Sequence, residues 1–360
     1  MRQKIFVVYQ YLILLITIFI SFFVKKDNSL LLICVKNNIT ENHKALFDYL
    51  SHSGSKTDLN VIVLYQTILP SCYNHLTSYK TFSFRGWFLF IKAKKVLISY
   101  GENDYKPYKR LPYQKIINMW HGIPLKNIGY NKNDFKVPWD FHIVSSIFEK
   151  EIMMSSFFLQ ENQIKILGVP KNDVLFSSKP IKPKNQILYL NTFREKIFSK
   201  FFSFENRDLN QINELLKKHE AYIVIKLHPN DINNQNVKEL LCFSQFILAD
   251  QSFDIQKELK QSLGLITDYS GAIFDALGID IPIILLPYDL QEYSKMRGFN
   301  RNYGEFLSDS QAFDQIRFIE LLKNIIYDKK IIGQESEKYF YYEYLDEKSS
   351  LRLLKFIQSI

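Results

Sequence analysis

From about Ser29 onward, short apolar runs alternate with amphipathic stretches along the chain. The runs LLLICV (30–35) and NVIVLY (60–65) indicate buried strands, and the stretch 42–50 between them indicates a helix. The same alternation continues to residue 176. Strands that alternate with helices predict a parallel sheet with helices on its faces. We therefore expect an α/β domain in this part of the chain.

A polar segment, SSKPIKPKNQ (177–186), interrupts this pattern. It breaks both the strand and the helix periodicity, as linkers do. A second series of strands and helices follows it, from 187 to 286. We therefore expect two α/β domains, residues 29–178 and 179–360, that face each other across a cleft.

The segment 5–24 is apolar and contains no charged residue, and basic residues flank it on both sides. Its length matches one helical crossing of a membrane. Residues 25–28 are polar and charged and offer no small-residue cleavage site, which argues against a cleaved signal peptide. We therefore expect residues 1–28 to form a membrane-associated hydrophobic helix that spans the membrane or lies on it. A buried element of the first domain is the alternative.

The composition narrows the class of protein. The chain has 360 residues, 47% of them hydrophobic, with 46 Lys and Arg against 37 Asp and Glu, a formal charge of +9. Strongly disordered and collagen-like proteins are excluded. Three widely spaced cysteines argue against a disulfide scaffold or a structural zinc site. The positive charge favours anionic partners, but no nucleic-acid-binding motif is present, so we expect no nucleic acid.

Two histidines follow predicted strands. His121 lies in WHGIPLK, after the predicted strand 113–120, where Gly122 and Pro124 predict a tight loop. His228 lies in KLHPND, after the predicted strand 222–227. Ligands of open α/β sheets bind at the carboxyl ends of strands, and imidazoles exchange protons near neutral pH. The two histidines are therefore candidates to converge across the cleft, one as a base and one as a donor to an anion. Purely structural roles are the alternative.

A third cluster, ITDYSG (266–271), joins a predicted strand to a helix. Ser270 is a good N-cap, and the free amides of the helix would suit a pyrophosphate, although simple capping explains the same residues. Asp289, Glu292 and Arg297 follow the next strand and are further rim candidates. The chain lacks the sequence motifs of P-loop NTPases, dinucleotide oxidoreductases, α/β-hydrolases and zinc proteases, which argues against these classes.

Five segments, in the same order and spacing, resemble the CDP-glycerol glycerophosphotransferase family of teichoic acid and capsule synthesis. They are WHGIPLKNIG (120–129), LGVPKNDVLF (167–176), KLHPND (226–231), LITDYSGAIFDAL (265–277) and PIILLPYDLQEYSKMRGF (282–299). The resemblance implies a GT-B fold with two Rossmann-like domains and the active site between them. Residues 29–178 would form the acceptor domain and residues 179–360 the CDP-donor domain.

The resemblance also implies an activity, the transfer of glycerol phosphate or a related polyol phosphate from a CDP-activated donor to a hydroxyl. The acceptor would be a lipid-linked or polymeric cell-surface glycan, and CMP would be released. Carried over by position, His121 and His228 are the catalytic residues, with His121 as the base. The residues expected to bind the donor or its phosphates are Gly122, Lys126, Arg194, Lys226, Asp268, Ser270 and Gly271.

Several alternatives stay open. The sequence departs from the family pattern at Asn191, Gly271 and 307–309. These departures leave open whether the donor carries glycerol, ribitol or another polyol. A GT-B glycosyltransferase using a nucleotide sugar and a non-catalytic scaffold of a polymer-assembly complex are the other functions. Mg²⁺ is compatible with a pyrophosphate donor, but no DxD pair follows a strand and no metal ligands are predicted. We expect the cell membrane as the location, with the catalytic domains on its cytoplasmic side.

Overall fold

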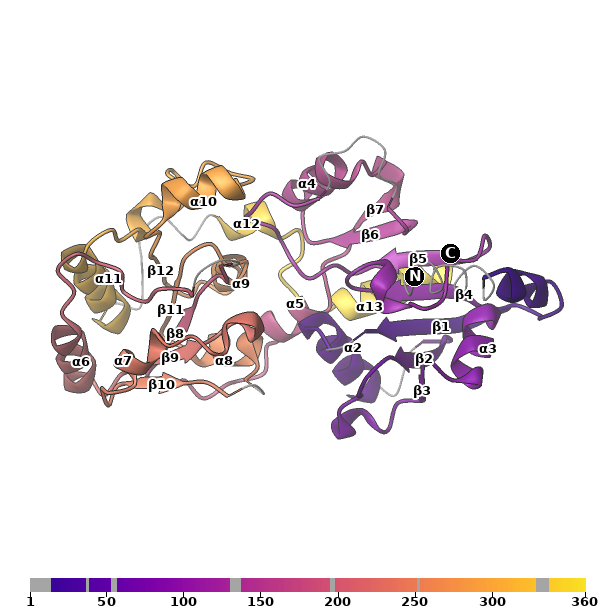
Figure 1. Cartoon of the computed structure of the whole chain (residues 1–360), viewed down its shortest axis with the longest axis horizontal. Helices are drawn as coiled ribbons and strands as arrows, with labels where there is room; N and C mark the ends of the chain where they lie inside the picture. Colours follow the sequence, from indigo (N-terminus) through magenta and orange to yellow (C-terminus); the bar gives the residue numbers. More distant parts are fainter. Residues whose placement is uncertain are drawn as a thin grey trace, which may run out of the picture.

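The computed structural model describes two parallel sheets that lie side by side along the long axis of the molecule (Figure 1). The predicted α/β architecture with parallel sheets is therefore confirmed. The residues that the structure describes are 14–36, 39–52, 57–129, 137–194, 198–250, 253–327 and 337–360.

The first sheet has seven strands in the order β3-β2-β1-β4-β5-β6-β7, and every pairing in it is parallel. The residues 30–35 of its strand β1 are a continuous apolar run, as expected of a parallel strand that is buried on both faces. The strands are β1 (Asp27–Val35), β2 (Asn60–Tyr65), β3 (Ser78–Lys80), β4 (Ala93–Ile98), β5 (Lys115–Asn118), β6 (Phe141–Val144) and β7 (Ile164–Ile166). The helices of this region are α2 (Glu41–His52), α3 (Phe84–Lys92), α4 (Ile147–Phe157) and α5 (Lys171–Leu175).

The second sheet has five parallel strands in the order β10-β9-β8-β11-β12. Alternate residues of its central strand enter opposite cores, with Ile187 on one face and Leu188 on the other. The strands are β8 (Gln186–Leu190), β9 (Tyr222–Lys226), β10 (Phe246–Leu248), β11 (Gly264–Thr267) and β12 (Ile283–Leu285). The helices are α6 (Leu209–Lys218), α7 (Val237–Leu240), α8 (Ile255–Gln261), α9 (Ala272–Gly278), α10 (Leu290–Met296) and α11 (Gln315–Tyr327).

The C-terminal region returns to the first sheet. Helix α12 (Lys338–Tyr341) contacts both α4 and α9, and α13 (Ser349–Ser359) contacts α2 and α5. The apolar stripe of α13, Leu353, Leu354 and Ile357, is buried in one core with the strand β1. In Figure 1, the yellow α13 accordingly lies among the indigo and magenta elements. The second domain predicted as 179–360 therefore does not include α13, because the apolar surface that α13 needs belongs to the first sheet.

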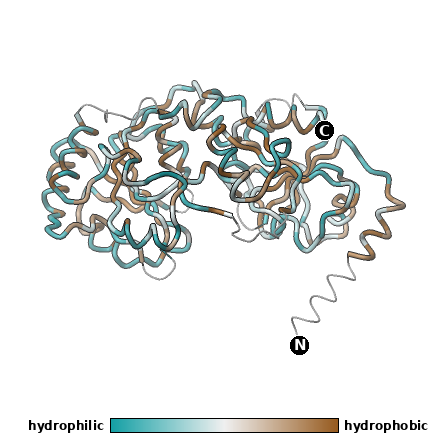
Figure 2. Tube along the Cα trace, turned by 90° about the horizontal axis from the view of Figure 1, so that it is seen from above, coloured by the Kyte–Doolittle hydropathy of each residue, from teal (hydrophilic) through white to brown (hydrophobic). Residues whose placement is uncertain are grey.

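Residues 14–21 form a helix that presents its polar side to the protein. Thr17 and Ser21 are buried, and the indole nitrogen of Trp87 in α3 donates to the Thr17 hydroxyl at 2.9 Å. Phe19 is 65% exposed and Phe22 is 80% exposed. Figure 2 shows this apolar stretch in brown at the edge of the molecule.

Among the described residues, no helix combines the length and the apolar content needed to cross a membrane. Residues 1–13, which include much of the predicted hydrophobic segment, lie outside the described part of the chain.

The strand orders also indicate where ligands bind. The order of the first sheet reverses between β1 and β4, and that of the second between β8 and β11. Open α/β sheets bind ligands beyond the carboxyl ends of the strands at such points. Most of the predicted site residues lie on the segments that follow β5, β8, β9, β11 and β12, whereas Lys226 is the last residue of β9 and Glu292 lies in α10.

Candidate active site

The loop that carries His121 follows β5 and is held at its start by two asparagines. The side-chain oxygen of Asn118 accepts from the Trp120 amide at 2.8 Å, and the side-chain amide of Asn42 donates to the Trp120 carbonyl at 2.9 Å. Trp120 adopts a left-handed backbone conformation, with φ 55°, and its indole stacks on His121 with ring centroids 4.2 Å apart. Such strained residues concentrate at functional sites. The loop therefore fixes the orientation of the His121 ring.

His121 is neutral at physiological pH. Although solvent reaches the side chain, the surrounding protein desolvates the ring and lowers its pKa to about 4. The ammonium groups of Lys171 and Lys126 add to this lowering, whereas a hydrogen bond with the Ser99 backbone opposes it. A neutral imidazole can accept a proton. The protonation state thus suits the predicted role of a base.

The second half of the same loop is attached to the other domain. Lys126 forms an antiparallel β-bridge with Phe299, and the Asn127 amide donates to the Gly298 carbonyl at 3.2 Å. The Asn300 side chain donates to two carbonyls of the loop, at 3.0 and 2.9 Å. Gly298 has φ 67°, and a Cβ there would collide with the Asn127 side chain. The loop from β5 therefore contacts both domains, and the backbone conformation at position 298 favours glycine.

Lys126 connects the two histidines electrostatically. Its ammonium lowers the pKa of both His121 and His228. Burial lowers the pKa of Lys126 itself, the nearby Asp268 carboxylate raises it, and Arg297 lowers it. The ammonium therefore lies within electrostatic reach of both predicted catalytic residues and of two predicted binding residues. These side chains come from loops after β5, β9, β11 and β12.

His228 lies just after β9 and begins the short 3-10 helix η4 (Pro229–Asp231). Its Nδ1 accepts a hydrogen bond from the Asn230 amide at 3.1 Å, and its ring stacks on Phe193 with centroids 5.3 Å apart. Because Nδ1 is an acceptor, the proton of the neutral ring resides on Nε2. Burial and the charge of Lys126 lower the pKa of the ring. His228 is exposed and presents an N–H donor rather than a cation.

Arg194 lies beneath this surface and does not face solvent. Its Nε and Nη2 donate to the two carboxylate oxygens of Asp289, at 2.8 and 2.9 Å. Its Nη1 donates to the Thr192 carbonyl at 2.6 Å and lies 3.0 Å from a carboxylate oxygen of Asp268. The guanidinium is therefore occupied by two carboxylates and a carbonyl. The prediction that Arg194 binds the donor directly does not fit this geometry, which instead makes Arg194 and Asp289 supports of the site.

The segment 268–271 has two structural roles. One carboxylate oxygen of Asp268 accepts from the amides of Thr192, at 2.8 Å, and Tyr269, at 2.6 Å, so it joins the ends of β8 and β11. The Ser270 hydroxyl accepts from the Ala272 amide at 3.2 Å, but the N-cap residue of α9 is Gly271 rather than the predicted Ser270. A Cβ on Gly271 would lie 3.4 Å from the Ile123 carbonyl of the His121 loop. The segment is thus adjacent to that loop.

Lys226 and Glu292 are the remaining predicted residues of the donor side. The Lys226 ammonium donates to the Asp250 carbonyl at 2.6 Å, and burial lowers its pKa. Glu292 is exposed in the first turn of α10.

A buried ion pair between the domains was not predicted. Lys171 in α5 places its ammonium 2.8 and 3.0 Å from the carboxylate oxygens of Asp275 in α9. Both residues belong to segments that carry the family resemblance, but the sequence pattern does not show that these segments meet.

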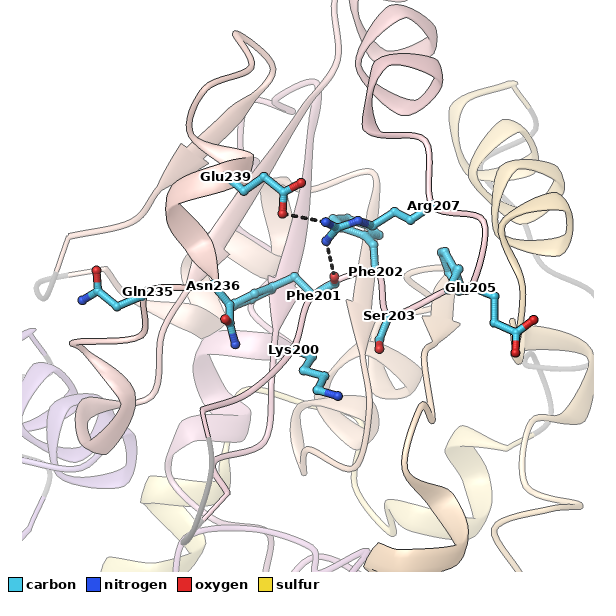
Figure 3. Close-up of a pocket in the computed structure, with 10 residues that line it drawn as sticks. Lys200, Phe201, Phe202, Ser203, Glu205, Arg207, Gln235, Asn236 and Glu239 are labelled. Atoms are coloured by element: carbon cyan, nitrogen blue, oxygen red, sulfur yellow. Dashed lines mark hydrogen bonds and ion pairs between the residues drawn. The ribbon is translucent and has the colours of Figure 1, made fainter.

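Two pockets of the second domain lie elsewhere. One, of about 600 Å³, is lined by residues that include Arg207 and Glu239 (Figure 3). Arg207 donates to Glu239 at 2.6 Å and to the Phe201 carbonyl at 3.3 Å, so its charge is paired. The other, of about 500 Å³, lies beside α10. No predicted site residue lines either pocket. The candidate site is the set of loops around Lys126, and its residues line neither of these two pockets.

The residues present do not fit a metal ion held by the protein. In the part of the chain that the structure describes, no group of three or more His, Cys, Asp and Glu side chains is arranged to hold one. The carboxylates of the donor loops, Asp268 and Asp289, are already paired with Arg194.

Comparison with known proteins identifies the family. The family model described as CDP-Glycerol:Poly(glycerophosphate) glycerophosphotransferase matches residues 14–359. The teichoic acid ribitol-phosphate polymerase TarK of Staphylococcus aureus is 24% identical over an alignment 352 residues long, which covers 88% of this chain and 66% of that protein. The teichoic acid glycerol-phosphate primase of Bacillus subtilis is 29% identical over an alignment 272 residues long, which covers 68% of each protein. The chain therefore spans about two thirds of the length of these relatives.

Solved structures show the same fold. The wall teichoic acid polymerase TagF superposes with a TM-score of 0.69 at 20% identity, covering 93% of this chain and 89% of that one. A putative UDP-N-acetylglucosamine 2-epimerase from Listeria monocytogenes reaches 0.55 at 14% identity, covering 93% and 96%. The fold is thus shared with a protein named for a nucleotide sugar, and the family assignment rests on the sequence match. Because that match covers nearly the whole chain, the protein belongs to the CDP-glycerol:poly(glycerophosphate) glycerophosphotransferase family, as its motifs predicted.

Proposed function

We propose that this chain transfers glycerol phosphate, or a related polyol phosphate, from a CDP-activated donor to a hydroxyl of a lipid-linked or polymeric cell-surface glycan. One observation carries the proposal: His121 and His228, on loops that follow strands of different sheets, both have a pKa that the Lys126 ammonium lowers. The relatives named as polymerases and primases of polyol phosphates support it. The two parallel sheets support a GT-B arrangement, with the first domain for the acceptor and the second for the donor.

In the proposed reaction, neutral His121 takes the proton of the acceptor hydroxyl. The acceptor oxygen forms a bond to the polyol-bearing phosphorus of the donor. The bond from that phosphorus to the bridging oxygen breaks, and CMP leaves with that oxygen. Such a displacement at phosphorus requires a base held next to the acceptor and an acceptor hydroxyl oriented toward the phosphorus.

The negative charge that develops on the phosphate oxygens needs donors that are already in place. The Nε2–H of His228 and the ammonium of Lys126 are available from the two domains, and Arg297 lies near Lys126. Gly122, Ser270 and Gly271 lie where the His121 loop approaches α9. The paired side chains of Arg194 and Asp289 connect the segments that follow β8 and β12, next to these groups.

We place the enzyme at the cytoplasmic face of the cell membrane. The Thr17–Trp87 hydrogen bond joins the helix 14–21 to α3, and this region exposes Phe19, Phe22 just after the helix, and Phe84. Lys25 and Arg85 are exposed in the same segments. Apolar surfaces flanked by basic residues bind the headgroup region of anionic leaflets. A lipid-linked acceptor would reach the site from this surface.

The decisive experiment measures CMP or UDP release by the detergent-solubilised protein from CDP-glycerol, CDP-ribitol and a UDP-sugar, each with a lipid-linked acceptor. The variants are His121→Ala and His228→Ala. The control is His75→Ala, which removes an exposed imidazole that contacts Ser51 at the far end of α2. We expect CMP release from one CDP-polyol, about a hundredfold slower or more without His121 and unchanged in the control.

Each other outcome identifies an alternative. Release of UDP from the UDP-sugar alone would contradict the proposal and make the chain a nucleotide-sugar transferase. A folded wild-type protein that releases neither nucleotide with any acceptor would point to the scaffold function instead.

A further inference from the structure

Lys171 is almost completely buried where the two domains meet, with 8% of its surface exposed. It begins α5, which contacts α2 and α13 on one side and α8 on the other, and which lies between the two domains in Figure 1. Lysine is almost never buried unless a carboxylate pairs with its ammonium. The Lys171 ammonium therefore requires a carboxylate partner inside the protein.

The ammonium end of Lys171 lies against the residue that follows His121. Gly122 has φ 124°, which disfavours other residues, and a Cβ there would meet Nζ of Lys171 at 2.9 Å and Cε at 3.2 Å. Position 122 thus has no side chain at the place where the Lys171 ammonium lies. The ammonium also stands among the charges that keep the His121 ring unprotonated.

Asp275 connects this lysine to the donor side of the site. Its two carboxylate oxygens lie 2.8 and 3.0 Å from the ammonium, and one of them also accepts from Gln256 at 3.1 Å. Asp275 lies one turn into α9, the helix that begins directly after Ser270 and Gly271. The pair therefore attaches the His121 loop to the helix next to the donor segment.

The backbone of Lys171 is attached to the same loop by a second route. The side-chain oxygen of buried Asn42 accepts from the Lys171 amide at 3.0 Å, and its amide nitrogen donates to the Trp120 carbonyl. Main chain and side chain of Lys171 thus hold the loop on both sides of His121.

We propose that Lys171 is a positioning residue, which fixes the His121 loop against α9 and keeps a positive charge beside the imidazole so that His121 stays ready to accept a proton. This inference rests on the proposed role of His121 as the base. Lys171 itself contacts no reacting atom in this scheme.

The other groups that face His121 do not supply this charge. Tyr100, after β4, has a raised pKa, and His142, in β6, has a pKa lowered to about 3 by burial, so both are neutral between pH 4 and 8. Lys126 is the other cation near the ring, and it belongs to the same loop. Of the cations near the ring, Lys171 is therefore the one that also contacts α9, through its ion pair with Asp275.

The test is a titration of His121 by NMR in the full-length protein with ¹³C-labelled histidine, the signal being identified by its loss in His121→Gln. The variants are Lys171→Met, which keeps the length of the side chain but not its charge, and the conservative Lys171→Arg. The double variant Lys171→Met with Asp275→Asn removes both charges, so that no unpaired carboxylate is left to unfold the protein. Circular dichroism at each pH defines the folded range.

We expect wild type and Lys171→Arg to keep His121 neutral down to about pH 5. The midpoint should rise by about one pH unit in Lys171→Met and in the double variant. In CMP release at pH 6, a midpoint of about 5 still leaves the His121 ring mostly neutral. We therefore expect the kcat of the double variant to fall about tenfold because the His121 loop is no longer fixed against α9, with KM for the donor changed less than twofold. An unchanged His121 midpoint in the double variant would overturn the inference. If the wild type releases no CMP from any CDP-polyol, the proposed function fails, and the titration alone decides the role of Lys171.

Discussion

Buried charged side chains near the site are held in pairs. Arg194 lies between Asp268 and Asp289, and Lys171 is paired with Asp275. Removing one partner of a buried pair leaves an uncompensated charge, which costs about 3–5 kcal/mol. The loops that carry the predicted site residues are therefore fixed by the charges beneath them, and variants of these buried residues affect folding as well as activity.

Glu149, in α4, is a buried carboxyl group. One of its carboxylate oxygens accepts from the Ser145 amide at 2.7 Å, and the other has no hydrogen-bond partner among the described residues. Burial raises its pKa to about 7. The folded state thus holds a proton that the unfolded state releases above about pH 4.5, so this residue makes stability fall as the pH rises from about 4.5 through 7.

We predict that Glu149→Gln removes this part of the pH dependence. At pH 8 the variant should be more stable than the wild type by up to about 3 kcal/mol, and at pH 4.5 the two should be similar. Urea unfolding at both pH values measures the difference. Glu151→Gln, on an exposed position of the same helix, is the control. A variant that keeps the wild-type difference between the two pH values would contradict the prediction.

At the level of the elements, the sequence pattern is informative where strands are buried on both faces. The predicted strand 60–65 coincides with β2, and the predicted strand 30–35 lies within β1, because buried parallel strands are continuous apolar runs. The positions of His121 and His228 after strands follow from the same pattern. The pairing of Arg194 with Asp289 could not be predicted, because strand periodicity does not specify which distant side chains meet across loops.

Helix α13 shows the same limit. Its apolar residues at 353, 354 and 357 predict a buried face, but they do not specify which sheet covers it. In the structure that sheet is the first one, although most of the preceding chain belongs to the second.

We predict that Leu353→Ala destabilises the first domain. The side chain is fully buried, and a leucine-to-alanine change in such a core costs about 2–5 kcal/mol. Thermal unfolding, with hydrogen exchange of β1 as the local readout, measures the effect. Lys355→Ala, on the exposed face of α13, should leave both unchanged. Faster exchange confined to the second sheet would show that the helix acts elsewhere.

At the level of the whole molecule, several contacts join the two sheets. The chain crosses between them at the segment 176–186 and again after α12, and the bridge of Lys126 with Phe299 and the pair of Lys171 with Asp275 add further links. An exposed ion pair between Lys257 and Asp48, at 4.0 Å, contributes little by comparison. The loops of the candidate site are therefore held together without a bound substrate.

We predict that the exposed apolar surface of helix 14–21 and α3 binds vesicles that contain anionic lipid. The double variant Phe19→Ser with Phe22→Ser should bind vesicles at least about tenfold more weakly. It lacks two apolar rings that would be buried in the bilayer interface. Binding by the wild type should also weaken as salt screens the neighbouring basic residues. Sedimentation with vesicles measures both effects.

The control for this experiment is Ile316→Ser, which removes a side chain that is 84% exposed on α11 of the second domain. Equal loss of binding in this variant, or binding that does not depend on the phenylalanines, would contradict the prediction.

The return of α13 to β1 also bears on how the protein is made. A ribosome synthesises α13 only after all the described strands of both sheets, yet this helix covers side chains of β1 such as Leu31 and Ile33. While the second sheet is being translated, the nascent first domain therefore leaves this apolar patch open to chaperones and to aggregation. The core of the first sheet is therefore completed only when α13 has left the exit tunnel, after the second sheet has been synthesised.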